Sequence, residues 1–320
     1  MSTKRFDARR WLRTNWLELL LLAVLLVALG WLVALGREIW PKVRPEPTPT
    51  PGPAIFDGQR ALGVVTFLTA LGPRTPGSDA LKATAERVEE VLRDSGWQVE
   101  VQDFTLDGIT RRNIVATAGE GDAILVGAHY DSSPRADLDS NPANRALPPP
   151  GANDGGSGTA VLLELARALD KERLAGQVSL VFFDAQYDSD GQPVAAGVQA
   201  WAEQTPTVDP PQAAVLIALL GGATQQFSID TLSDPLLSQQ LWDSAEQLGY
   251  AGWFISEPQP AINLGQQTLA SLGGPVAVIA GSDAVTWRTL QDTPEQIDPR
   301  SLGRVGRLLQ VFLENQPVSQ

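Results

Sequence analysis

The sequence predicts an α/β domain built on a largely parallel sheet that is covered by helices on both faces. The chain has 320 residues, of which 43% are hydrophobic, enough to build the core of one large domain. Beyond residue 54, short apolar segments of strand length alternate with helical segments. Several of these apolar segments are unbroken, which indicates strands that are buried on both faces.

The period of the apolar residues sets the expected elements. Continuous apolar runs of strand length are typical of the centre of a parallel sheet, and spacing of three to four residues indicates helices. The predicted strands cover residues 97–104, 112–118, 123–128, 178–183, 213–220 and 275–280. The predicted helices cover residues 79–95, 158–169, 194–203 and 299–314.

An apolar segment near the N-terminus predicts a single transmembrane helix over residues 16–36. Every residue from 19 to 35 is apolar or glycine, and Trp16 and Leu17 bring the run close to the ~20 residues that a bilayer requires. A cleaved signal peptide is the alternative, but the run is long for one and no clear small-residue cleavage site follows. Five basic residues precede the span, so we expect residues 1–15 in the cytoplasm and residues 41–320 outside.

A proline-rich segment separates this span from the domain. Residues 41–53 hold six prolines in thirteen positions, which favours an extended polyproline conformation and excludes a helix or a sheet interior. We therefore predict a stalk over residues 37–53 and a folded domain over residues 54–320. A second proline-rich stretch, residues 133–150, is interpreted either as a lid over a cleft or as a disordered loop.

The composition excludes several classes of function. The net charge is −13, and residues 1–44 carry +5, which leaves −18 on the remainder. Such an acidic domain repels nucleic acid, so we expect no nucleic-acid partner. The chain has no cysteine, which rules out a disulfide, a thiolate metal site and a cysteine nucleophile. It has one histidine, His129, so a zinc site here is poor in nitrogen ligands.

Two segments carry candidate chemistry. His129 ends a predicted strand, where sites form in α/β sheets, and Asp131 lies two residues on, in position to orient the imidazole. Asp154 precedes a predicted helix in a turn of small residues, and Ser157 is a candidate cap for that helix. A serine hydrolase using Ser157 and His129 is disfavoured, because the spacing of a nucleophile elbow is absent.

With these segments in place, the chain resembles peptidase family M28, the zinc aminopeptidases and their glutaminyl cyclase relatives. The matching pieces appear in the family order and span residues 54–320: GPRTPGS at 72–78, RNIVA at 112–116, VGAHYDS at 126–132, PGANDGGSGTAVLLELAR at 150–167, VSLVFFDA at 178–185 and WRTLQDTPEQID at 287–298. The resemblance implies a three-layer zinc-exopeptidase fold with a mostly parallel, mixed sheet. It also implies two zinc ions bridged by Asp154, with His129 as a ligand of one and Asp131 orienting it.

The remaining family positions depart from that pattern. Where the resemblance implies a glutamate as general base and a glutamate ligand, this chain has Gln186 and Tyr187. An amide cannot take a proton from water, so the general base is absent at that position. Ala218 and Arg288 stand where a carboxylate and a second histidine ligand are implied. His129 and Asp154 are the two implied ligands that remain, and residues 264–266 also replace an acidic and histidine-containing family segment.

These departures predict a catalytically inactive, membrane-anchored module that binds or scaffolds at the cell envelope. A peptide or protein is the expected ligand of the old cleft, and we expect no cofactor, or zinc if the site is still competent. We predict that Arg288 pairs with Asp154 in place of a metal. The alternative is an active metal-dependent aminopeptidase or glutaminyl cyclase with unusual ligands. Candidate substitute ligands for that alternative are Asp184, Asp188, Asp190 and Asp283.

Overall fold

A computed structural model describes residues 15–18, 20–32, 54–174, 176–204, 211–281 and 285–315. The chain divides into two compact units, Met1–Gly52 and Pro53–Gln320. The first unit contains a helix over Asn15–Leu32 with a mean hydropathy of 2.1. None of this helix is buried against other parts of the protein, and by length and composition it can cross a membrane. The predicted stalk lies outside the described residues.

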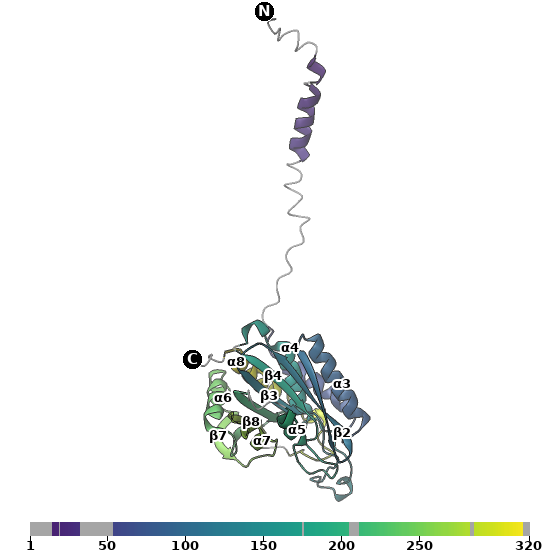
Figure 1. Ribbon diagram of the computed structural model, residues 1–320, viewed down its shortest axis with the longest axis vertical. Helices are drawn as coiled ribbons and strands as arrows, with labels where there is room; N and C mark the ends of the chain where they lie inside the picture. The colour runs from purple at the N-terminus through teal and green to yellow at the C-terminus, as the bar shows by residue number, and fades with distance from the viewer. Residues whose placement is uncertain are drawn as a thin grey trace, which may run out of the picture. The chain divides into compact units, whose positions relative to one another are not determined.

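The second unit is built on a six-stranded mixed sheet, as the resemblance implies, with the strand order β1-β2-β4-β3-β5-β8 (Figure 1). Strands β4, β3, β5 and β8 are parallel to one another, whereas β2 pairs antiparallel with both β4 and β1. The strands are β1 (Gln98–Leu106), β2 (Ile109–Ala118), β3 (Ala123–His129), β4 (Gln177–Phe183), β5 (Ala213–Ala218) and β8 (Val276–Ala280). A parallel pair, β6 (Phe227–Asp230) and β7 (Phe254–Gln259), forms a separate small sheet.

Helices cover both faces of the large sheet. Strand residues point alternately to two apolar clusters: Val126 and Leu180 join the first, whereas Leu125 and Val181 join the second. The first cluster is completed by α2 (Gly58–Ala70), α3 (Asp79–Asp94), α4 (Gly156–Ala168), α6 (Pro235–Gln247) and α8 (Pro299–Asn315). The second is completed by α5 (Ala196–Gln204) and α7 (Gln266–Ala270). The fold is therefore a sheet between two helical layers.

Local backbone geometry explains where two predicted elements end differently. The predicted strand over 213–220 ends at Ala218, because Leu219 has a φ of 55° and cannot continue a strand. The predicted helix over 194–203 starts at Ala196, because Ala195 has a φ of 50°. Ser157 lies inside α4 rather than at its cap, which is Gly155, so the expectation that Ser157 caps this helix is wrong.

Residues 133–150 are described throughout and contact the segment that follows β8. The Leu138 N–H donates to the Arg288 carbonyl at 3.2 Å, and the Leu290 N–H donates to Asp139 Oδ2 at 3.0 Å. Asp139 is buried, and its pKa is lowered by the backbone hydrogen bonds from Leu290 and Asn141. The segment thus has fixed contacts with residues 288–290, next to Trp287.

Candidate functional site

The candidate site lies where parallel strands end at the same edge of the sheet, the usual location in α/β folds. His129 is the last residue of β3, and Ala218 is the last residue of β5. Gln186 and Tyr187 follow β4 after a turn at Ala185, whose φ is 54°. Asp154 stands two residues before α4. Segments far apart in the sequence therefore meet at one edge of the sheet.

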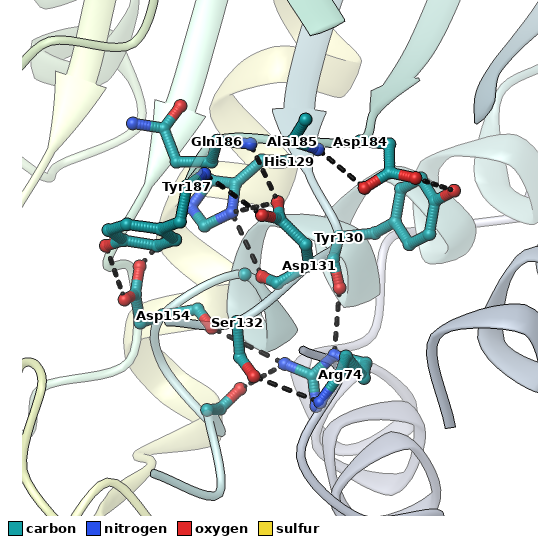
Figure 2. A network of polar contacts seen from close by, with 12 residues as sticks. Arg74, His129, Tyr130, Asp131, Ser132, Asp154, Asp184, Ala185, Gln186 and Tyr187 are labelled. Atoms are coloured by element: carbon teal, nitrogen blue, oxygen red, sulfur yellow. Dashed lines mark hydrogen bonds and ion pairs between the residues drawn. The ribbon is translucent and has the colours of Figure 1, made fainter. Parts of the chain in front are cut away.

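The imidazole of His129 lies between two carboxylates (Figure 2). Its Nδ1 is 3.2 Å from Asp131 Oδ1 and 3.1 Å from the Asp131 carbonyl oxygen. Its Nε2 is 3.3 Å from Asp154 Oδ1. Burial lowers the pKa of His129, but the hydrogen bonds to Asp131 and Asp154 and the charges of both carboxylates outweigh it and raise the pKa to about 10. The imidazolium therefore donates from both nitrogens at neutral pH.

The second oxygen of Asp154 accepts hydrogen bonds from two aromatic side chains. The Tyr187 hydroxyl donates to Asp154 Oδ2 at 2.7 Å, and the Trp287 indole N–H lies 3.2 Å from the same oxygen and from the Tyr187 hydroxyl. Burial, and then the charge of Asp154, raise the pKa of Tyr187 well above its usual value. The phenol thus keeps its proton and acts as a donor.

Asp131 does more than orient His129. Its Oδ1 accepts from the Gln186 backbone N–H at 3.1 Å, and its Oδ2 accepts from the Tyr187 backbone N–H at 3.2 Å. The carboxylate is fully buried, so these contacts fix the turn that follows β4. They depend on the backbone of residues 186 and 187 and are unaffected by which side chains stand there.

A buried arginine holds the loops on the other side of the site. Arg74 is fully buried, and its guanidinium donates to the carbonyl oxygens of Tyr130, Pro150, Gly151 and Asp154 (Figure 2). Burial lowers the pKa of Arg74, and the carboxylates of Asp292, Asp131 and Asp154 oppose that shift. The guanidinium therefore joins the end of β3 to the loop that carries Asp154.

Two further features fix the Asp154 loop. Asp292 accepts from the backbone N–H groups of Asn153 and Asp154 at 2.6 and 3.0 Å. Gly155 has a φ of 82°, and a Cβ there would lie 2.1 Å from the Asp131 carbonyl oxygen. Burial and the charge of Asp154 raise the pKa of Asp292 to about 7. The path of this loop thus depends on a glycine and on a buried carboxyl.

The positions at which metal ligands and a base were expected serve other purposes. The Gln186 side chain is buried, and its Nε2 donates to the Asn263 carbonyl at 2.7 Å. Ala218 contributes only a methyl group. Arg288 forms an ion pair with Asp137 at 2.6 Å and donates to the Gly191 carbonyl at 2.9 Å. The predicted Arg288–Asp154 ion pair is therefore wrong: Asp154 is satisfied by other groups, and Arg288 binds two loops at the rim.

These residues do not fit a zinc ion. Two zinc ligands at ~2.1 Å in tetrahedral geometry lie about 3.4 Å apart, so the 3.3 Å between His129 Nε2 and Asp154 Oδ1 is compatible with shared ligation. A third protein ligand is the difficulty. Tyr187 is a protonated phenol, Ala218 has no donor, and the part of the chain that the structure describes contains no group of three His, Cys, Asp or Glu that could hold a metal.

A cavity of about 330 Å³ opens beside these groups. His129, Asp154, Gln186 and Tyr187 contribute polar atoms to it, and the rest of the wall is mainly apolar. The apolar wall includes Pro193, Ala218, Leu219, Ile262, Leu264 and Trp287. A larger groove of about 820 Å³ lies between α2, α3 and α4, and none of the polar site residues line it. The smaller cavity is therefore the one related to the candidate chemistry.

Two of the proposed substitute ligands, Asp184 and Asp188, have their partners outside the site. The Asp188 carboxylate accepts from the backbone of residues 190 and 192 within its own loop. Asp184 faces the other way, toward Arg111 and the backbone of Arg112. The Ser157 hydroxyl donates to the Asn153 carbonyl, and the nearest partners of His129 are aspartates. Asp283 lies outside the described residues.

Sequence reasoning missed the residues that complete the network. Trp287 and Asp292 stood within a recognised motif, but nothing in their spacing indicated contact with Asp154. The roles of Tyr187 as a donor and of Arg74 as a brace depend on segments that meet only in the fold. Arg74 stood within the GPRTPGS motif, but its burial is evident only in the fold.

The fold and site together define an α/β exopeptidase-type domain with an altered polar centre. The family model described as Peptidase family M28 matches residues 113–313. The chain therefore belongs to peptidase family M28. It is 38% identical over 126 residues to the uncharacterized protein YfbL of Escherichia coli (strain K12), an alignment that spans 38% of this chain and 38% of that protein. The chain thus matches well under half of the length of this curated relative.

Solved structures support the same fold over nearly the whole of their length. A leucine aminopeptidase precursor from Bacteroides thetaiotaomicron has a TM-score of 0.77 at 25% identity, covering 83% of this chain and 99% of that chain. A glutaminyl cyclase from Bacteroides thetaiotaomicron, bound to N-acetylhistamine, has a TM-score of 0.77 at 26% identity, covering 82% and 99%. The predicted fold and family are confirmed.

Proposed function

We propose that this protein is a non-catalytic member of its family, which acts as a membrane-anchored binding or scaffold module at the cell envelope. The observation that carries the proposal is the state of Gln186. Its amide stands where a general base is implied, is buried, and donates to the Asn263 carbonyl. An amide has no proton-accepting capacity at neutral pH, so water activation at this position is lost.

The ligand we propose is a peptide or protein segment that enters the cavity of about 330 Å³. Both oxygens of Asp154 already have donors within the protein, which leaves little capacity for a ligand's ammonium group. Apolar contacts with residues such as Ile262, Leu264 and Trp287 therefore supply most of the binding energy in this proposal.

An active aminopeptidase or glutaminyl cyclase is the second candidate. It is favoured by the similarity of this chain to a leucine aminopeptidase precursor and to a glutaminyl cyclase, and by the retention of His129, Asp131 and Asp154. Rates of hydrolysis of aminoacyl anilides and of cyclisation of N-terminal glutaminyl peptides, measured on the full chain in detergent with micromolar zinc, separate the two. Our proposal requires wild-type rates no higher than those of Asp154→Ala. A wild-type rate well above that of this variant would establish the second candidate.

Binding has its own test. Fluorescein-labelled peptides with apolar N-terminal residues should bind the wild-type chain in an anisotropy titration. Ile262→Arg, in the cavity wall, should weaken binding at least about tenfold, because a charge in an apolar contact costs more than ~1.4 kcal/mol. Phe67→Arg, on α2 and outside this cavity, is the matched control and should have no effect. Equal loss in both variants would count against the cavity as the binding site.

The membrane arrangement is part of the same proposal: residues 1–15 in the cytoplasm, 16–36 in the bilayer, 37–53 as a stalk and 54–320 outside. The absence of cysteine makes single-cysteine labelling clean. A membrane-impermeant maleimide applied to intact cells should label Gln59→Cys, which is exposed on α2, and should not label Thr3→Cys. The opposite pattern would reverse the proposed orientation.

A further inference from the structure

We infer that the side chains of Tyr187 and Trp287 do for Asp154 what the family resemblance assigns to a zinc ion, so that this domain folds and persists without metal. The inference goes beyond the proposed binding role and does not depend on it. It concerns how a buried carboxylate is satisfied, and it holds whether or not a peptide enters the cavity.

Asp154 carries the argument because its carboxylate is only 2% exposed. A buried carboxylate without partners is strongly unfavourable, so its oxygens require donors or a cation. Here Oδ2 accepts from the Tyr187 hydroxyl at 2.7 Å and lies 3.2 Å from the Trp287 indole nitrogen. Oδ1 lies 3.3 Å from His129 Nε2. Each oxygen therefore has a donor within the chain.

The donors form a directional chain of hydrogen bonds. An indole N–H can only donate, so Trp287 donates to the Tyr187 hydroxyl oxygen at 3.2 Å. That hydroxyl in turn donates a hydrogen bond to Asp154 Oδ2. The Tyr187 hydroxyl thereby both donates and accepts a hydrogen bond within the site.

Tyr187 also occupies space. Its side chain is 1% exposed, and its ring centroid lies 6.1 Å from that of His129 in an edge-to-face arrangement of 81°. The Arg288 guanidinium lies 5.6 Å from the ring centroid and is fixed by Asp137 and the Gly191 carbonyl. The phenol ring therefore lies close to both the imidazole and a guanidinium, a cation that would itself repel a metal ion.

The test uses the full chain in detergent micelles and measures zinc content and melting temperature. After equilibration with micromolar zinc and removal of free metal, we expect less than ~0.1 zinc per chain by elemental analysis, since two ligands do not make a site. The melting temperature should be the same in zinc and in EDTA. A bound zinc at a hundred times its Kd would raise it by about 5–11 °C. One zinc per chain, or such a rise, would overturn the inference.

Variants assign the role to the phenol. Tyr187→Phe should lower the melting temperature by a few degrees, equally in zinc and in EDTA, because Asp154 loses its shortest hydrogen bond. Tyr250→Phe is the matched control and should have little effect. The double variant Tyr187→Glu with Arg288→His restores two family ligands and should gain zinc that is lost again on His129→Ala. If the double variant does not fold, the wild-type zinc measurement still decides the matter. An unchanged melting temperature in Tyr187→Phe would refute the role of the phenol.

Discussion

The two halves of the candidate site differ in whether their residues agree with the family pattern. In the half at the end of β3, which we call the retained half, His129, Asp131 and Asp154 agree with the family pattern. Each of these residues forms polar contacts with backbone groups or with another of the three. The other half is formed by the ends of β4 and β5 and by the segment after β8, and we call it the altered half. There Gln186, Tyr187, Ala218 and Arg288 stand where the resemblance implies a base and metal ligands. The difference teaches that the residues that agree with the family pattern are also those whose side chains hold the backbone of the site in place. Retention of a motif such as His129-Tyr130-Asp131 is therefore weak evidence of activity.

Arg74→Ala should have the largest effect, because it removes the brace of the retained half. Four backbone carbonyl oxygens would each lose a hydrogen bond from a fully buried guanidinium. We expect the free energy of unfolding in urea to fall by about 3–5 kcal/mol. Arg87→Ala, on the exposed face of α3, should cost less than ~0.5 kcal/mol. Similar losses in both variants would mean that the brace contributes little.

Gly155→Ala tests how far the retained half depends on the backbone conformation of the loop that carries Asp154. The added Cβ would lie 2.1 Å from the Asp131 carbonyl oxygen at a φ of 82°. We expect a loss of about 2–4 kcal/mol in the free energy of unfolding. Gly96→Ala is the matched control: its φ is 76°, but nothing lies within 4 Å of the added Cβ, so only the ~1–2 kcal/mol of left-handed strain should appear. Equal losses would show that the loop yields to the clash.

Asp184→Asn tests the pH dependence of stability at Asp184, which follows β4 directly. Burial, followed by the charge of Asp131, raises the pKa of Asp184 to about 7 from an ordinary value of 3.8. Between pH 3.8 and about 7, Asp184 therefore carries a proton in the folded state but not in the unfolded state. The stabilisation is fully present below about pH 4 and is lost as pH rises through 7, at up to ~1.4 kcal/mol per pH unit.

The asparagine variant lacks this dependence. Its stability relative to wild type should therefore rise between pH 4 and pH 7, as measured by urea unfolding at each pH. The Arg111 guanidinium, whose Nη1 lies 3.6 Å from Asp184 Oδ1, is present in both proteins. Parallel stability curves for the two proteins would show that Asp184 is ionised throughout this range.

Arg288→His should have the smallest effect, although it restores a family ligand in the altered half. It removes the ion pair with Asp137, which is 38% exposed, and the bond to the Gly191 carbonyl. We expect a loss of about 1 kcal/mol in the free energy of unfolding, with no gain of zinc. Arg300→His, in an ion pair whose arginine is 78% exposed, should cost less still. Zinc binding by Arg288→His alone would show that Tyr187 does not prevent it.

The sequence predicted the centre of the large sheet well, because strands β3, β4, β5 and β8 are largely buried and contain continuous apolar runs. The small pair β6 and β7 was missed because four- and six-residue strands carry little pattern, and because 23 residues, 231–253, separate the two strands in the sequence. Helix α2 was also missed. Its segment contains two glycines and the β-branched run Val64-Val65-Thr66, which weaken the helical signal.

The candidate site was predictable only where the family pattern is kept. The family resemblance places His129, Asp131 and Asp154 together. The partner of Arg288 could not, since Asp137 lies 151 residues away in a proline-rich segment without a periodic pattern. The choice between Asp154 and Asp137 depends on loop paths that no local rule specifies.

The contacts of Asp131 with the backbone of residues 186 and 187 have a consequence for protein engineering. Because this turn is held by main-chain groups, side chains at both positions can be exchanged while the turn keeps its geometry. Many small metal-binding domains couple folding to the ion, so that the metal-free protein is unfolded. A zinc centre installed on this scaffold would load and unload on a frame that stays intact, a useful starting point for a metal-operated sensor.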